Sequence, residues 1–166
     1  MKPMAAKSRK SKDKEKQGQV AVNKKAYMNF ELVEKIEAGM ELLGTEVKSL
    51  RAAAADLSGS YARIEDGQCW LVGASIAQYE QAGQHQHEPA RKRKLLLHKI
   101  ELRKLRIKLE QRGFTLVPLR IYFNDRGLAK IELALARGKR QYDKRKTITE
   151  RDSKREVDRS MKKYRK

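Results

Sequence analysis

Hydrophobic and polar residues alternate along much of this chain with a period of two, the pattern of strands that have one buried face. The clearest case is the segment 61–72, where two alternating runs flank Asp66-Gly67. An Asp-Gly pair supports the positive φ angles of a type I′ turn, so the segment predicts a β-hairpin. The residues predicted to face each other across it are Ile64 with Cys69 and Arg63 with Trp70.

Alternation also predicts the other strands. Residues 115–123 and 129–135 form a second pair of runs around a turn at 124–127, and Pro118 indicates an edge or a bulge because proline has no amide hydrogen to donate. Weaker alternation over 27–43 predicts two short strands separated by a break at Glu37-Ala38-Gly39. Residues 74–79 predict a further strand that continues the sheet.

Helical periodicity is found in two places. After Gly44, Thr45 is a candidate N-cap, with Glu46 favourably placed in the first turn of a short helix. Leucines 95, 102, 105 and 109 recur at helical spacings and Gly113 supplies a stop, so residues 91–112 are predicted to form the longest helix.

About six short strands with inserted helices predict a mainly β fold, and a small closed β-barrel suits them better than a sandwich or a βαβ sheet. The pattern leaves open whether this is an OB-like (oligonucleotide-binding) barrel or another partly open barrel. We expect the folded domain to span residues 20–137. Residues 1–19 are predicted to be a disordered basic arm, and residues 138–166 a basic tail.

The distribution of charge supports this division. The chain carries 40 basic and 21 acidic residues, a net charge of +19. Residues 1–25 hold 9 basic and 2 acidic residues, and residues 138–166 hold 13 and 5, whereas the middle of the chain is nearly balanced. Basic arms on a balanced domain favour a polyanionic partner, because each neutralised phosphate releases counterions. Basic tails that only increase solubility are the alternative.

Catalytic and metal-binding motifs are not found. The sequence has no nucleophile elbow, P-loop or dinucleotide fingerprint, and its single cysteine, Cys69, excludes an internal disulfide framework and predicts a buried thiol. His85 and His87 beside Glu88 are interpreted as solvated loop residues rather than metal ligands. We expect no enzyme activity, metal or cofactor, and, without an apolar span or signal segment, a soluble cytoplasmic protein with no membrane partner.

Three segments are candidates for RNA contact. Arg91, Lys92, Arg93 and Lys94 would open the long helix, where four cations oppose the helix dipole, so a bound phosphate explains them better than folding does; a solvated run is the alternative. Asn23, Lys24 and Lys25 combine an amide with two cations. Glu37 beside Gly39 can accept a hydrogen bond from a base or a ribose.

The basic tail has helix-forming residues but little to pack. From Lys144 onward there is no Gly or Pro, and Arg151, Arg155, Arg159 and Lys163 follow one ridge. Isolated helices of this length are marginal in water, so we expect the tail to become helical only where a polyanion surrounds it. A permanently disordered tail is the alternative.

These motifs together resemble one family. The chain resembles the SmpB family over residues 20 to about 158, and the motifs occur in the family's order. The matching stretches are NKKA (23–26), EAG (37–39), GTEVKSLR (44–51), Ser60-Tyr61, RKRKLLL (91–97), GFTLVP (113–118) and GKRQYDKR (138–145).

The resemblance implies an oligonucleotide-binding barrel and a non-enzymatic role. The implied partner is the tRNA-like domain of transfer-messenger RNA (tmRNA), which the protein would deliver, with elongation factor Tu and GTP, to stalled ribosomes for rescue and peptide tagging. There it would act in the decoding centre and message channel, against ribosomal RNA. The RNA-binding residues that this assigns are Asn23, Lys24, Lys25, Glu37, Ala38, Gly39, Arg91, Arg93, Lys94, Leu96 and Lys130.

The resemblance also implies that the tail enters the empty message channel as a helix. The tail residues assigned to the ribosome are Gly138, Lys139, Arg140, Asp143, Lys144, Arg145, Arg151, Arg155, Arg159 and Met161. Met28 stands where many members have a stacking histidine, and a thioether cannot donate the hydrogen bond of an imidazole.

The alternatives to this adaptor function are an OB-type ribosomal or ribosome-assembly RNA-binding protein and an RNA-processing enzyme.

Overall fold

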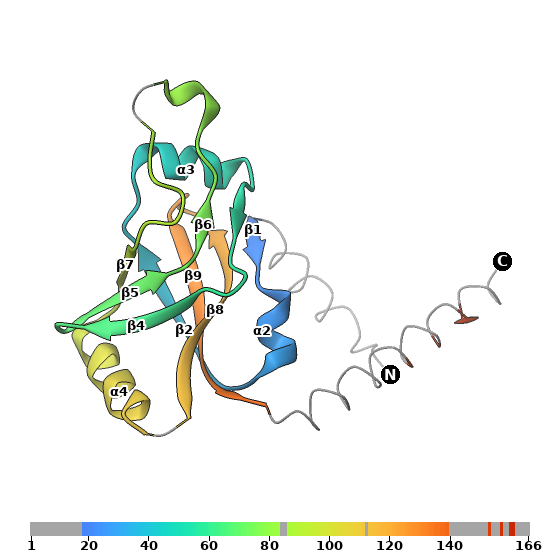
Figure 1. The fold of residues 1–166 in the computed structure, drawn as a ribbon, viewed down its shortest axis with the longest axis vertical. Coiled ribbons are helices and arrows are strands. Elements are labelled where there is room, and N and C mark those ends of the chain that lie inside the picture. The colour runs from blue at the N-terminus through green and yellow to red at the C-terminus, as the bar shows by residue number, and fades with distance from the viewer. Residues whose placement is uncertain are drawn as a thin grey trace, which may run out of the picture.

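The computed structural model describes residues 18–83, 86–111 and 113–139, together with 153, 157, 160 and 161. The described part is mainly β, with three α-helices and one 3-10 turn (Figure 1). The strands are β1 (Gln19–Val22), β2 (Phe30–Met40), β3 (Ala55–Asp56), β4 (Tyr61–Glu65), β5 (Gln68–Val72), β6 (Ser75–Ile76), β7 (Arg93–Leu96), β8 (Phe114–Phe123) and β9 (Ala129–Gly138). The helices are α2 (Lys24–Asn29), α3 (Gly44–Arg51), α4 (Lys99–Leu109) and the 3-10 turn η1 (Glu80–Ala82).

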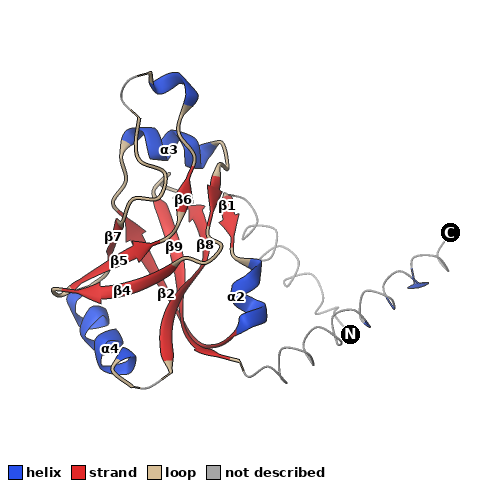
Figure 2. Ribbon diagram, viewed as in Figure 1, coloured by secondary structure: helices blue, strands red, loops and turns tan. Residues whose placement is uncertain are grey.

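The main sheet closes on itself. Its strand order is β1-β8-β4-β5-β7-β2-β9, and β8 also pairs with β9, so six antiparallel strands form a ring with β1 attached beside β8 (Figure 2). β3 and β6 form a separate two-stranded sheet. The prediction of a mainly β fold with inserted helices is therefore confirmed.

The two strongest pairs of predicted strands are confirmed, the first of them with its predicted register. β4 and β5 pair Ile64 with Cys69 and Arg63 with Trp70, and both turn residues have positive φ angles, 48° at Asp66 and 68° at Gly67. β8 and β9 pair along their length, with a register shift between Pro118 and Arg120 that is the predicted bulge. Local alternation and turn chemistry were sufficient because both pairs are hairpins.

The prediction of two short strands over 27–43 is wrong. Residues 24–29 form α2, because the side chain of Asn23 caps that helix. Phe30–Met40 is then one strand without a break at Glu37-Ala38-Gly39, because β9 pairs with it through Gly39 and β7 pairs with its last two residues. A strand hydrogen-bonded on both sides holds a glycine in extended backbone.

The predicted long helix over 91–112 is also wrong. Residues 93–96 form β7, in which Arg93 and Leu95 point inward while Lys94 and Leu96 point outward. Only Lys99–Leu109 are helical, and the carboxylate of Glu101 accepts the backbone N–H of His98 at 3.0 Å to cap the first turn. Three consecutive leucines fit either a strand or a helix, so periodicity alone did not separate the two.

Two smaller predictions fail as well. The run 74–79 does not continue the main sheet, since β6 pairs only with β3. The N-cap of α3 is Leu43 rather than Thr45, and the Glu46 side chain accepts the Leu43 N–H at 2.8 Å.

Two clusters of buried residues hold the fold. The larger lies inside the ring and includes Leu71, Leu95, Leu116, Ile131 and Leu133. The smaller lies under α2, where Ala26 packs on outward residues of β8 and β9, so this part of the sheet is covered on both faces. Figure 1 shows α3 and α4 near opposite ends of the sheet, with α2 along its side.

Candidate nucleic-acid interface

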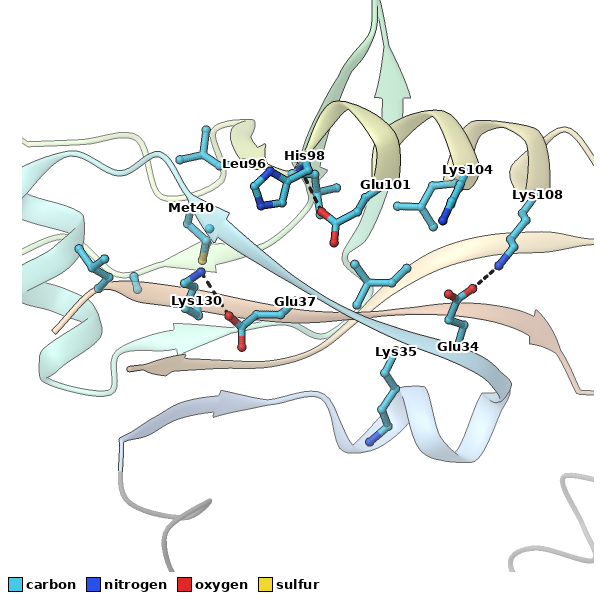
Figure 3. A pocket seen from close by; sticks show the side chains of 16 residues that line it. Glu34, Lys35, Glu37, Met40, Leu96, His98, Glu101, Lys104, Lys108 and Lys130 are labelled. Carbon is cyan, nitrogen blue, oxygen red and sulfur yellow. Dashed lines mark hydrogen bonds and ion pairs between the residues drawn. The ribbon is translucent and has the colours of Figure 1, made fainter. Parts of the chain in front are cut away.

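A groove of about 870 Å³ lies between β2, β7, α4 and the start of β9 (Figure 3). Four of the predicted RNA-binding residues line it: Glu37, Gly39, Leu96 and Lys130. Ala38 lies between two of them in β2, and its side chain is buried. The other lining residues are Glu34, Lys35, Ile36, Met40, Leu97, His98, Glu101, Lys104, Leu105, Lys108, Leu128 and Ala129.

Strand register brings these four residues together from three distant segments. Gly39 of β2 is paired with Leu96 on one side and with Lys130 on the other. A Cβ at Gly39 would lie 3.3 Å from the Cβ of Leu96, so the glycine leaves room for that leucine at the edge of the groove. The Leu96 side chain remains 52% exposed, and Leu128 across the groove is 57% exposed. The groove therefore offers apolar contacts at two points along its rim.

Glu37 is the oriented acceptor of the groove. The hydroxyl of Tyr122 donates to one carboxylate oxygen, and the ammonium group of Lys130 lies 3.2 Å from the other. The Tyr122 hydrogen bond, followed by the hydrogen bond and charge of Lys130, lowers the pKa of Glu37 against the opposing effect of burial. An ionised, half-exposed carboxylate beside apolar side chains suits a ligand with hydrogen-bond donors and a flat apolar face, such as a nucleoside.

The α4 side of the groove is lined by residues that the sequence did not single out as a site. Lys108 pairs with Glu34 of β2, and Lys104 lies one turn earlier on the helix (Figure 3). His98 stands at the helix start. Glu101, three residues after His98, is a capping signal that could have placed the helix start here and brought these side chains to the groove.

Arg91 and Arg93 have a folding role, contrary to the interpretation that a bound phosphate explains them better than folding does. Arg93 is fully buried, and its Nε donates to Glu46 at 2.9 Å. The remaining guanidinium hydrogen bonds of Arg93 go to the carbonyl groups of Ala74, Pro89 and Arg91. The Nη2 atom of Arg91 lies 2.5 Å from the other carboxylate oxygen of Glu46, and the Arg91 side chain is only partly exposed. In this structure the Arg93 guanidinium has no surface with which to meet a phosphate.

Glu46 is the centre of that cluster. Burial by itself raises the pKa of Glu46, but the hydrogen bonds from Arg91 and the Leu43 N–H and the charge of Arg93 bring it below its ordinary value. The carboxylate thus ties the start of α3 to β7, the strand that carries Leu96. We interpret Arg91, Arg93 and Glu46 as a support that positions the groove.

Asn23 is also committed to the fold. Its side-chain NH₂ group donates to the carbonyl groups of Leu57 and Pro118, each at 3.1 Å, and its carbonyl oxygen accepts the N–H of Ala26 at 3.1 Å. The residue is 5% exposed. The amide predicted to read a nucleotide edge is therefore a helix cap with both of its polar groups occupied.

The other predicted cations lie outside the groove. Lys24 and Lys25 are exposed on α2, and Lys94 points outward from β7. Lys139 is held against α2, since its backbone N–H donates to Asn29 at 2.9 Å. Gly138, which pairs with Phe30, ends β9.

Most of the tail prediction lies outside the described residues. Beyond Lys139, the tail residues that the structure does describe are Ser153, Val157, Ser160 and Met161, which are helical and exposed. The assigned residues outside the description are Arg140, Asp143, Lys144, Arg145, Arg151, Arg155 and Arg159. Almost all of the predicted N-terminal arm, namely residues 1–17, also lies outside the described residues.

Two predictions about other chemistry are tested here. Cys69 is fully buried as predicted, and burial raises the pKa of its thiol to about 11. The interpretation of His87 as solvated is wrong, because its ring is buried between Thr45 and Ile76. The described residues hold no group of three or more His, Cys, Asp and Glu side chains able to bind a metal. No helix in the described part of the chain is long and apolar enough to span a membrane.

Comparison with known proteins gives consistent results. The family model described as "SmpB protein" matches residues 20–163. An SsrA-binding protein of Sulfurihydrogenibium sp. is 52% identical over 143 residues, which are 86% of this chain and 93% of that protein. An SsrA-binding protein of Chlorobaculum tepidum is 52% identical over 142 residues, with coverage of 86% and 90%.

A solved structure is similar as well. It is described as "tmRNA-SmpB: a journey to the center of the bacterial ribosome", and its chain superposes with a TM-score of 0.63 at 53% identity. The match covers 76% of this chain and 92% of the solved one.

Proposed function

The chain belongs to the SmpB protein family, and on that premise we propose that it is the tmRNA-binding adaptor of trans-translation, which brings tmRNA to stalled ribosomes. The observation within the molecule that carries the proposal is the row of Leu96, Gly39 and Lys130 across three paired strands, with Glu37 beside it. Its work is binding and positioning of RNA rather than chemistry.

We assign the groove to the tRNA-like domain of tmRNA. Glu37 accepts hydrogen bonds from a base edge or a ribose hydroxyl, Leu96 packs on an apolar ring face, and Lys130 neutralises phosphate. Lys94 and the exposed Lys24 and Lys25 add electrostatic attraction around it. Asn23, Arg91 and Arg93 support the fold beneath this surface, because their polar groups are engaged within the protein.

The closed ring of six strands serves, in this proposal, as an OB-like barrel. The tail, residues 138–166, whose Lys139 is held against α2, binds ribosomal RNA in the decoding centre and message channel through the basic residues assigned from the sequence. Elongation factor Tu with GTP joins through the charged end of the tmRNA, and the complex works in the cytoplasm, where the ribosomes are.

The first test is identification of the RNA that copurifies with the full-length protein. We expect one tRNA-like species that ends in CCA. Ribosomal RNA at stoichiometric occupancy that resists high salt would instead favour a permanent ribosomal or ribosome-assembly protein, and turnover of the RNA with a divalent ion would favour an RNA-processing enzyme.

The second test separates the groove from general attraction. Glu37→Ala should weaken binding of the tRNA-like RNA about tenfold at physiological salt, because a hydrogen bond to a charged group contributes about 1.5–3 kcal/mol and tenfold corresponds to about 1.4. Glu31→Ala is the matched control, since Glu31 lies on the same strand but outside the groove. Equal affinity of both variants would reject the groove as the binding site.

A further inference from the structure

The outward face of β4, β5 and β7 carries an aromatic side chain between two cations. Register places Arg63 opposite Trp70 and Trp70 opposite Lys94, so the three residues form one row across neighbouring strands. All three side chains are half-buried. Figure 2 shows β4 and β5 running side by side toward one edge of the sheet, with β7 next to β5. We call these three residues the Trp70 row.

Trp70 is half-buried but lies outside the two clusters of buried residues. Its neighbours Cys69 and Leu71 are buried inside the ring, and strand alternation turns Trp70 to the other face. Within the described part of the chain, Trp70 belongs to neither cluster of buried residues. The part of this large ring that stays exposed is available to a partner.

The two flanking cations have free hydrogen-bonding capacity. The Nε of Arg63 is buried but has no hydrogen-bond partner among the described residues, although one of its terminal nitrogens pairs with Glu65 at 2.9 Å. Among the residues that the structure describes, no carboxylate lies within ion-pair distance of Lys94. The Arg63 side chain is 37% exposed, so a ligand with acceptor oxygens can approach its outer part and Lys94, although not the buried Nε.

The Trp70 row is continuous with the groove. Lys94 and Leu96 point to the same side of β7 two residues apart, and Leu96 lines the groove through its pairing with Gly39. Adjacent strands lie about 4.8 Å apart, so the backbones of Arg63 and Lys94 stand about 10 Å apart with the indole between them. That spacing leaves room for one base over the indole and a phosphate on either side.

We propose that the Trp70 row binds one unpaired nucleotide of the same RNA that occupies the groove, with its base stacked on Trp70 and its flanking phosphates held by Arg63 and Lys94. This inference rests on the proposed function and adds a second contact to it. Cations on both sides of the ring favour a polyanion over an apolar protein partner, and stacking on an aromatic side chain is how unpaired bases are commonly held.

The experiment uses the full-length protein and the tRNA-like RNA. The sequence has one tryptophan, so tryptophan fluorescence reports Trp70 alone. We expect saturating RNA to quench it strongly. Trp70→Leu should weaken binding about tenfold, whereas Trp70→Phe, which keeps an aromatic face, should stay within about threefold. Arg63→Gln should lower the slope of log affinity against log salt by about 0.7–0.9.

Two controls keep the result specific. Urea unfolding of both Trp70 variants checks that they fold. Tyr79→Leu makes the same aromatic-to-leucine change at another half-buried ring, one that has Lys48 over it at 5.1 Å, and should bind as the wild type does.

Unchanged fluorescence at saturating RNA, or wild-type affinity of a folded Trp70→Leu variant, would overturn the inference and leave this face to a protein partner. An equal loss for Tyr79→Leu would overturn it too, because the effect would then follow any lost ring. If the wild type does not bind the RNA at all, the proposed function itself fails, and the inference falls with it.

Discussion

Replacing Glu46 by glutamine removes one negative charge from the contact between α3 and β7 while keeping the side chain's shape. Glu46 and Arg93 are both fully buried, with the Arg93 Nε and a Glu46 oxygen 2.9 Å apart. Removing one partner of a buried ion pair costs about 3–5 kcal/mol, because the remaining charge is left without compensation. The glutamine oxygen still accepts one N–H, so we expect the lower end, about 3 kcal/mol.

Urea unfolding at pH 7, followed by circular dichroism, measures this loss as a lower midpoint with an unchanged slope. Glu110→Gln is the control, because Glu110 is an exposed residue paired with Arg106 on α4, and it should change the free energy of unfolding by less than about 0.5 kcal/mol. A Glu46→Gln loss below about 1 kcal/mol would refute the role given to this charge.

The wild type and the Glu46→Gln variant also allow a test of the pH dependence of stability. The pKa of Glu46 is lowered in the folded state, so its charge stabilises the fold fully above the ordinary carboxyl value of 4.5. This contribution is lost as the pH falls from there through the lower folded pKa. The difference in free energy of unfolding between wild type and Glu46→Gln should therefore narrow below pH 4.5. A difference that stays constant down to pH 3 would contradict the assignment.

Three further predictions test other parts of the molecule. Asn23→Ala removes a helix cap and one donor each to the carbonyl groups of Leu57 and Pro118, of which the Leu57 carbonyl keeps its hydrogen bonds from Ser60. Unfolding should therefore become easier by about 2 kcal/mol, while the folded protein keeps its RNA affinity within about threefold. A tenfold affinity loss at unchanged stability would restore Asn23 as an RNA contact. Tyr122→Phe removes the largest cause of the lowered Glu37 pKa, so an NMR titration should show that pKa rise, and an unchanged value would show that the hydroxyl does not hold the carboxylate. Deletion of residues 144–166 should spare binding of the tRNA-like RNA but abolish peptide tagging on stalled ribosomes; RNA affinity lost as severely as in a groove variant would show that the two roles are not divided this way.

The sequence by itself determined the parts of the fold that depend on neighbours along the chain. The hairpin at 61–72 and the β8–β9 pair were predicted with their turns, because alternation and turn residues act within a dozen positions. Resemblance to the family identified Glu37, Gly39, Leu96 and Lys130 as residues of one site. It did not say what each contacts.

Only the tertiary structure decided how those residues meet and what the nearby cations do. Leu96, Gly39 and Lys130 become neighbours through pairing of β7, β2 and β9, which come from distant parts of the chain. The sequence pattern predicted Arg93 as a surface cation. In the structure it is buried against Glu46, which lies 47 positions away in the chain. A charged side chain is buried only where the fold places an opposite charge beside it. Which residue provides that charge depends on contacts between distant parts of the chain, so a local sequence pattern does not reveal it.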